Sequence, residues 1–305
     1  MKAIVATDKA AGAAGIKVVE RPHPQPAIGD VVVQVYAASI TGDELSWPST
    51  WTDRENHDRT PSVPGHELAG VVSAIGYGTT GLSIGQRVFG LTDWTRDGTL
   101  AEYIAVEARN LAPLPGDVDF TVGAAIVMPG LTAWQGLFDH GHLQAGQRVL
   151  VHGAAGIVGS MAVQLARAAG AYVIGTGHAD ARDTALDFGA HEFVDLDKEV
   201  LENVGHVDLV FDVLGGDIAK RSAALIRAGG TLVTITGPTE VRPPEGVTID
   251  FVVVPDPVQL TEIVGRVRDG RLRPHIGSII TLDEAVGVFN PTRRVRGKTI
   301  IRVHP

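Results

Sequence analysis

The stretch RVLVHGAAGIVGS, residues 148–160, decides the fold, because an apolar run leads there into a turn of spaced glycines. After the turn, apolar residues recur at helical spacing as far as Ala169, and Gly170 suits the end of a helix. A second apolar run, residues 172–176, follows as a buried strand. The order strand, glycine turn, helix, strand predicts a βαβ unit.

The glycine turn has the chemistry of a phosphate loop. Its spacing is A-x-G-x-x-G, because Ala154 stands where the pattern usually has its first glycine. Gly156 lets the backbone approach a pyrophosphate, Gly159 lets the helix press on the strand, and free N–H groups at the helix start attract phosphate. We therefore expect a bound dinucleotide, held by Gly153, Ala155, Gly156, Ile157, Val158 and Gly159.

Composition limits the class of protein. The 305 residues are 44% hydrophobic, enough for about two domains with full cores. A formal net charge of −9 has the wrong sign for binding nucleic acid. The chain has no cysteine, its first residues lack the apolar core of a signal peptide, and no run is long enough to span a bilayer. We expect a cytoplasmic protein with neither disulfides nor thiolate metal sites.

Residues 1–115 have the pattern of short strands separated by glycine and proline. The expected strands are residues 3–6, 16–20, 30–36, 69–75, 86–90 and 101–106. Such spacing indicates a small, partly closed β-barrel. Residues 45–63 mix bulky aromatic and charged side chains without a period, which indicates a loop or a short helix over a cleft.

Downstream, helical and strand patterns alternate. The expected helices are residues 120–125, 131–138, 181–188, 217–227 and 258–269, and the expected strands after residue 176 are residues 191–194, 207–212, 231–235, 247–254 and 297–303. Near-continuous apolar strands between helices predict a parallel sheet covered on both faces. We expect the last strand to rejoin the barrel.

Five motifs in this order resemble the medium-chain dehydrogenase/reductase superfamily, and within it the zinc-independent quinone oxidoreductase branch. They are VPGHELAGVV at 63–72, GQRV at 85–88, GLTAW at 130–134, the glycine loop, and GKTII at 297–301. The resemblance covers essentially the whole chain and implies an α/β protein. It implies a GroES-like β-barrel catalytic domain from residues 1–115 and 256–305, and a doubly wound parallel-sheet Rossmann NADP-binding domain from residues 116–255. It also implies a homodimer formed at the apolar edge strand 248–254.

The end of the second Rossmann strand, Thr176-Gly177-His178, indicates which dinucleotide binds. An enzyme for NAD usually has an acid there for the ribose diol, and this segment has none. His178 and Arg182 lie close enough to meet a 2′-phosphate, although Asp180 between them would repel it and Arg182 could equally be a solvated helix residue. We favour NADP(H).

The resemblance implies where the rest of the cofactor lies. Leu214, Gly215, Ile235 and Thr236 follow the fourth and fifth strands, where the family holds the nicotinamide ribose. The nicotinamide is expected to face Thr41 and Thr132, and Lys298 to reach the cofactor from the last strand.

The zinc alcohol dehydrogenases of the superfamily bind a metal through a cysteine, the histidine of the G-H-E motif and a third ligand. Here Thr41 stands where the cysteine aligns, no cysteine can supply the third ligand, and the four-cysteine structural lobe is missing. His66 and Glu67 alone do not make a tetrahedral site. We predict no metal and read both as structural or cleft-lining residues; the alternative is an atypical site made by Asp43, His66 and Glu67.

Chemistry without zinc favours an electron-poor acceptor over a simple alcohol. Hydride transfer to a quinone or an α,β-unsaturated carbonyl compound fits, and the resemblance implies the same. The family commonly has asparagine near position 41 and then a tyrosine, whereas this chain has Thr41, Trp47 and Trp51. The cleft candidates are Thr41, Asp43 and Trp47, with Trp94 beside them, unless they serve as turn hydroxyl, helix cap and edge packing.

Two further functions stay open on the sequence alone. The chain could be an alcohol dehydrogenase with an atypical metal site, or a catalytically weak NADPH-binding regulatory protein. Solvent could also supply the proton in place of a side chain.

Overall fold

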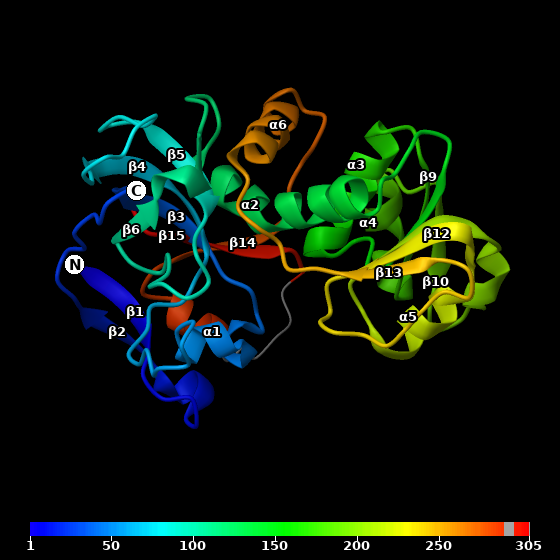
Figure 1. Ribbon diagram of the computed structural model, residues 1–305, viewed down its shortest axis with the longest axis horizontal. Helices are drawn as coiled ribbons and strands as arrows, with labels where there is room; N and C mark the ends of the chain where they lie inside the picture. The colour runs from blue at the N-terminus through cyan, green and yellow to red at the C-terminus, as the bar shows by residue number, and fades with distance from the viewer. Residues whose placement is uncertain (290–295, 305) are drawn as a thin grey trace. The chain divides into compact units, whose positions relative to one another are not determined.

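A computed structural model describes residues 1–289 and 296–304, and it divides into two compact units (Figure 1). Unit 1 comprises Met1–Met128, Pro255–Arg271 and His275–Pro305, and unit 2 comprises Pro129–Val254 and Leu272–Pro274. The dividing point between the units thus falls within one helix, α2 (Phe120–Trp134), at Met128. Unit 1 is assembled from both ends of the chain.

Unit 1 is built mainly on antiparallel strands, with β14 and β15 paired in parallel. A two-stranded sheet pairs β1 (Lys2–Ala6) with β2 (Ile16–Glu20). The larger sheet has the order β14-β15-β3-β4-β5-β7, and β6 also pairs with β3. Its strands are β3 (Asp30–Ser39), β4 (Glu67–Ile75), β5 (Arg87–Leu91), β6 (Tyr103–Glu107), β7 (Leu111–Pro113), β14 (Ile276–Thr281) and β15 (Lys298–Arg302). The expected return of the last strand to this sheet is confirmed, because β15 pairs with β3.

The helices of unit 1 are short apart from two. They are α1 (Pro48–Trp51), α6 (Pro257–Arg268), the first part of α2, and 3-10 turns at Gly12–Gly15, Glu44–Ser46, Ala108–Asn110 and Ala285–Phe289. The Asp256 carboxylate caps α6 by accepting from the N–H groups of Val258 and Gln259. The core consists mainly of Val, Ile, Leu and Ala from the strands, as the alternating pattern of an antiparallel sheet requires.

Register brings three loops of unit 1 and strand β15 to one end of the sheet. Ser39, the last residue of β3, pairs with Glu67, the first residue of β4, and with Ile300 near the start of β15. Glu67 in turn pairs with Leu91, the last residue of β5. The segments after β3 and β5 and before β4 therefore meet beside β15, and they carry most of the candidate catalytic residues.

Unit 2 is a six-stranded parallel sheet in the order β10-β9-β8-β11-β12-β13. The strands are β8 (Arg148–Val151), β9 (Tyr172–Gly177), β10 (Glu192–Asp195), β11 (Val207–Asp212), β12 (Ile226–Thr234) and β13 (Val247–Asp250). The helices are α3 (Ile157–Ala168), α4 (Arg182–Asp187), α5 (Gly216–Ala223), the end of α2 with a π-helical turn Gln135–His140, and 3-10 turns at Ala179–Ala181 and Leu201–Val204. The predicted doubly wound sheet is confirmed, and the strand order reverses between β8 and β11. Ligands bind at such a point, outside the carboxyl ends of the strands.

Several expected boundaries were wrong. The helical patterns at residues 120–125 and 131–138 belong to one helix with Pro129 inside it. Strand β13 ends at Asp250, since the Gln135 side chain takes both backbone groups of Val254, with N···O distances of 2.8 and 3.1 Å. Strand β12 starts at Ile226, where we expected helix, and β7 and β14 were not expected. Short, half-polar strands such as β14 give little periodic signal.

One helical stretch of the described residues, Phe120–His140, is long and apolar enough to cross a membrane. Most of it is buried, as expected for the core helix of a soluble protein. This stretch therefore gives no support for a membrane segment.

Candidate active site

A buried ion pair lies at the loop end of the unit 1 sheet. The Lys298 ammonium, at the start of β15, donates to Glu67 Oε1, at the start of β4, and both side chains are almost wholly buried. Glu67 Oε2 accepts from the backbone N–H of Met128 at 3.0 Å. Breaking such a pair leaves an uncompensated buried charge, so the pair fixes how β4 and β15 lie on the two sides of β3. We predicted that Lys298 reaches the cofactor; in unit 1 its ammonium is bound to Glu67.

Next to this pair lies a second buried acid, Glu44, in the turn after β3. Its carboxylate accepts from the N–H of Gly65, and its Oε1 lies 3.5 Å from His66 Nε2. Burial raises the pKa of Glu44 to about 7, and burial lowers the pKa of His66 to about 4. Near neutral pH, His66 is therefore uncharged and Glu44 is poised between its two protonation states.

Three rings form a cluster above this acid, which we call the aromatic cluster: Trp47, His66 and Trp94. Trp47 stacks on His66 with ring centroids 6.0 Å apart, and Trp94 lies 4.7 Å from His66 and edge-on to Trp47 at 5.6 Å. Both tryptophans are partly exposed. The cluster thus offers flat apolar surface with a buried polar layer behind it.

The predicted catalytic residues Thr41, Asp43 and Trp47 lie on one short segment of unit 1. The Thr41 hydroxyl is half-buried and lies 3.8 Å from the sulfur of Met128. Asp43 is exposed and accepts from Trp47 Nε1 at 3.4 Å, a long hydrogen bond. The structure thus brings Asp43 and Trp47 together, and it leaves the Thr41 hydroxyl without a strong acceptor among the contacts described.

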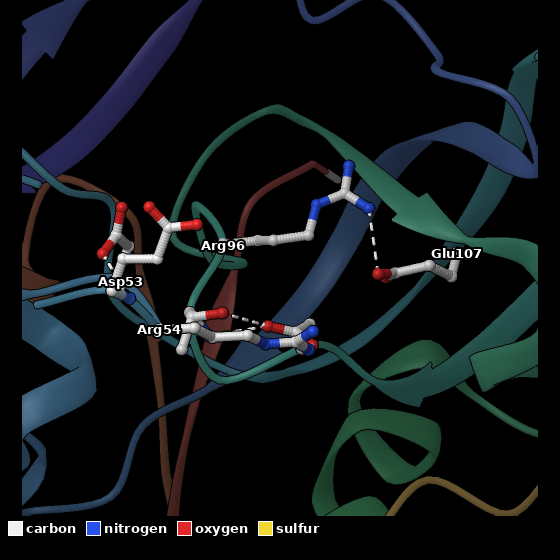
Figure 2. Close-up of a pocket in the computed structure, with 7 residues that line it drawn as sticks. Asp53, Arg54, Arg96 and Glu107 are labelled. Atoms are coloured by element: carbon white, nitrogen blue, oxygen red, sulfur yellow. Dashed lines mark hydrogen bonds and ion pairs between the residues drawn. The ribbon is translucent and has the colours of Figure 1, made fainter. Parts of the chain in front are cut away.

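A polar cavity of about 310 Å³ lies beside the loop that carries Trp94. Its lining residues are Asp53, Arg54, Glu55, Asp93, Thr95, Arg96 and Glu107. Figure 2 shows Arg96 reaching Glu107, at 3.1 Å, and Arg54 pairs with Asp93. Arg96 also binds both carboxylate oxygens of Asp30. All the lining residues are polar or charged, so the cavity lacks the apolar lining that a planar acceptor requires.

In unit 2, the glycine loop has the geometry that its sequence predicts. Gly156 is the N-cap of α3, and no side chain caps this helix. A Cβ on Gly159 would lie 2.1 Å from the Gly153 carbonyl oxygen, and one on Gly156 would lie 2.9 Å from it. Only glycine fits these positions, and the first N–H groups of α3 remain available to an anion.

The histidine before the loop braces the cofactor side of unit 2. His152 is fully buried, with Nδ1 2.8 Å from Thr176 Oγ1 and Nε2 2.7 Å from Ser222 Oγ. Ser222 gives its proton to the Ile218 carbonyl, so it accepts from Nε2–H, and Nδ1 accepts from Thr176. Burial lowers the pKa of His152 to about 4, so the ring is neutral. The Thr176 hydroxyl, predicted to bind cofactor, is buried and engaged here.

A buried carboxylate organises the loops after β11 and β12. Asp212 accepts from the N–H groups of Leu214 and Gly215, both at 3.0 Å, and from the Thr234 hydroxyl at 2.9 Å. Gly215 has φ +68°, and a Cβ there would lie 2.8 Å from Thr236 Oγ1. Leu214, Gly215 and Thr236 thus lie together, with Ile235 preceding Thr236, whereas Thr132 is buried on α2.

Both predicted 2′-phosphate residues contact carboxylates. His178 Nδ1 lies 2.8 Å from Asp197 Oδ2, and the Arg182 guanidinium binds Glu199. Both acids follow β10, the strand beside β9. Gly177 is the last residue of β9, and His178 and Arg182 follow it closely in the chain. The three residues therefore lie at the carboxyl end of this strand.

The metal-type donors of unit 1 do not fit a zinc ion. His66 Nδ1 faces Thr92 Oγ1 at 3.3 Å and Nε2 faces Glu44, while both Glu67 oxygens are engaged. Asp43, the third member of the atypical site considered above, is exposed and bonded to Trp47. Across residues 1–289 and 296–304, no three His, Asp or Glu side chains gather in a metal-binding group. The structure therefore does not bring Asp43, His66 and Glu67 together as a set of free metal ligands.

Comparison with known proteins agrees with this two-unit architecture. The alcohol dehydrogenase GroES-like domain matches residues 27–116, and the zinc-binding dehydrogenase domain matches residues 158–256. A quinone oxidoreductase of Pongo abelii is 32% identical over 231 residues, which are 72% of this chain and 69% of the relative. A 2-methylene-furan-3-one reductase of Solanum lycopersicum is 32% identical over 258 residues, 80% of this chain and 64% of the relative.

Among solved structures, the quinone oxidoreductase of Coxiella burnetii has a TM-score of 0.89 and 25% identity, covering 100% of this chain and 99% of its own. Fold and comparisons together define a two-domain oxidoreductase of the alcohol dehydrogenase type. The chain belongs to the medium-chain dehydrogenase/reductase superfamily, in its quinone oxidoreductase-like branch. The predicted fold class and family are confirmed, and members of this family use NAD(P)H.

Sequence reasoning missed four functional features: Glu44, the partnership of Glu67 with Lys298, the bracing by His152, and the acids that pair with His178 and Arg182. His152 had a usable signal, because a histidine inside an apolar strand is buried and needs partners. The others depend on pairings between distant segments, which have no local signal.

Proposed function

We propose that the protein transfers a hydride from NADPH to a quinone or an α,β-unsaturated carbonyl compound without the help of zinc. The observation that carries the proposal is the engagement of His66 and Glu67, the metal-type donors of unit 1, by Thr92, Glu44, Lys298 and the Met128 N–H. Donors engaged in this way are not available to hold a metal that would act as a Lewis acid on an alkoxide.

An electron-poor acceptor suits such a site. A quinone or enone spreads the incoming negative charge onto its own conjugated oxygen, so a hydrogen bond to that oxygen is sufficient help. The relatives named quinone oxidoreductase and 2-methylene-furan-3-one reductase support both acceptor types. In unit 1, Trp47 and Trp94 supply flat apolar faces for a planar ring, and Thr41 supplies a hydroxyl whose donor capacity is weakly used.

The residues of unit 2 fit a nicotinamide dinucleotide. NADPH, when bound, supplies the hydride from its nicotinamide ring. The uncapped start of α3 at Gly156 would hold the pyrophosphate, and the loops braced by Asp212 would line the nicotinamide ribose. The end of β9 has no acid of its own for a ribose diol, which supports NADPH as the cofactor. His178 and Arg182 would meet its 2′-phosphate. The proton for the product comes from solvent or from the Thr41 hydroxyl acting as a relay.

Oxidation of NADPH by the purified protein tests the proposal. The reaction is followed by the loss of NADPH absorbance, with a naphthoquinone, an enone or an alkanal as the acceptor. We expect turnover with the first two acceptors after dialysis against a chelator, and no gain on adding zinc. Thr41→Val should lower kcat, whereas Thr52→Val, at the end of α1, is the matched control. Turnover that requires zinc and an alcohol would support the alcohol dehydrogenase alternative, and NADPH binding without turnover would support a regulatory protein.

We also propose that the protein acts in the cytoplasm as a homodimer paired through β13. Strand β13 is an edge of the parallel sheet, and the side chains of Val247, Val252 and Val254 in and after it are exposed. An uncovered apolar edge is a template for pairing with another strand.

A further inference from the structure

The ribose end of strand β9 has acidic partners that its own sequence lacks. Residue 178, where an NAD enzyme usually has an acid, is histidine. Parallel pairing sets Asp195, the last residue of β10, opposite Gly177, and the N–H of Leu196 donates to the Gly177 carbonyl at 2.9 Å. The chain after β10 therefore runs past the end of β9 and carries Asp197 and Glu199 to it.

Hydrogen bonds hold these two acids in place. The N–H of Asp197 donates to the Asp195 carboxylate at 3.1 Å, and the N–H of Glu199 donates to the Asp195 carbonyl at 2.8 Å. Asp195 itself is buried, so the turn has a fixed anchor. Its two acids engage both nearby side chains, Asp197 the His178 ring and Glu199 the Arg182 guanidinium.

We propose that Asp197 and Glu199 are specificity-determining residues that reduce the preference for a 2′-phosphate, so that the protein uses NADH as well as NADPH. The inference rests on the proposed function in one respect, that the adenosine ribose lies at the end of β9. It goes beyond that proposal by assigning cofactor selectivity to residues of the neighbouring strand.

The physical reason is competition for the same two side chains, His178 and Arg182. A 2′-phosphate must displace the carboxylates from His178 and Arg182 and then lie beside two negative charges. The ribose diol of NADH carries no charge, and its hydroxyls can donate to the same carboxylates. Arg182 and Glu199 are each nearly half exposed, so their ion pair is weak enough for a ligand to open. The gain from binding the phosphate is thereby reduced, not abolished.

Binding of NADP⁺ and NAD⁺, each measured by calorimetric titration, tests the inference independently of turnover. We expect the wild type to bind the two within about tenfold of each other, since loss of a partly used charged hydrogen bond has this size. The double variant Asp197→Asn, Glu199→Gln should tighten NADP⁺ binding by about tenfold, which corresponds to the removal of two weak repulsive contacts. NAD⁺ binding should stay equal or weaken.

Glu202→Gln is the matched control. Glu202 forms a similarly exposed ion pair with Arg221 on α5, with N···O distances of 2.7 Å, and should leave both affinities unchanged. A wild type that binds NADP⁺ more than about a hundredfold tighter would overturn the inference, as would a double variant with an unchanged ratio. A protein that binds neither dinucleotide would overturn the proposed function itself.

Discussion

Replacing Glu44 with glutamine should change how the stability of unit 1 depends on pH. The Glu44 side chain is almost wholly buried, and burial raises its pKa from 4.5 to about 7. The folded protein therefore binds a proton more tightly than the unfolded chain does. The resulting contribution to stability is fully present below pH 4.5 and is lost as the pH rises through about 7.

The magnitude follows from the size of the shift. Each pKa unit corresponds to about 1.4 kcal/mol, so the wild type should lose about 3 kcal/mol of unfolding free energy through Glu44 as the pH rises through this window. Glutamine keeps the shape and can still accept from the Gly65 N–H, but it carries no charge at any pH. The variant should therefore match the wild type most closely below pH 4.5 and exceed its stability by up to about 3 kcal/mol at pH 8.

Urea unfolding at several pH values, followed by tryptophan fluorescence, reports mainly on unit 1, because Trp47, Trp51 and Trp94 lie there and Trp134 lies in unit 2. The buried histidines act in the opposite direction. Burial lowers the pKa of His66 and His152 to about 4, so their contribution is present above pH 6.5 and is lost as the pH falls toward 4.

Subtracting the unfolding free energy of the variant from that of the wild type at each pH cancels these histidine contributions. Glu240→Gln, at an exposed position of unit 2, should keep the wild-type dependence. A difference between wild type and Glu44→Gln that does not change between pH 5 and pH 8 would refute the reasoning.

Four other predictions concern cofactor binding, packing and assembly. Gly159→Ala should abolish NADP⁺ binding in a titration, because its Cβ would lie 2.1 Å from a loop carbonyl oxygen; normal affinity would contradict this. Lys298→Met should lower the unfolding free energy, measured by urea unfolding, by about 3–5 kcal/mol, because it leaves the Glu67 carboxylate buried without a partner. Adding Glu67→Gln should restore most of the lost stability. Arg182→Ala should weaken NADPH binding about tenfold and leave NADH nearly unchanged, and equal losses would remove Arg182 from the site. Sedimentation at micromolar concentration should give a dimer, and Val247→Lys on β13 should give a monomer; a wild type that is only monomer would count against the edge pairing.

The sequence predicts those parts of the fold and site that depend on local chemistry. The glycine loop was recognisable because close backbone approaches at Gly156 and Gly159 tolerate no side chain. The parallel sheet was recognisable because strands buried on both faces are almost continuously apolar.

Long-range pairings could not be read from the sequence. Glu44 lies just before the aperiodic segment 45–63, and its high pKa results from a fold that buries it beside His66. Inspection of the β9 end found no acid, because the acids arrive from β10. The end of β13 was also missed. The side chain of Gln135, in the turn after α2, makes the hydrogen bonds to the Val254 backbone that a neighbouring strand would otherwise make.

The pairing of β15 with β3 affects how the protein folds during synthesis. The six strands of unit 2 are consecutive in the chain, so all of them have left the ribosome before β15 is made. Until then β3 lacks one neighbour along Ala37–Ser39, and Glu67 lacks the Lys298 that neutralises it. A nascent chain thus carries a complete set of unit 2 strands beside a first unit with an open strand edge and an unpaired acid. Docking of the last strand closes that edge and supplies the missing charge in one late step, and before that step the emerging chain is most vulnerable to association with other chains.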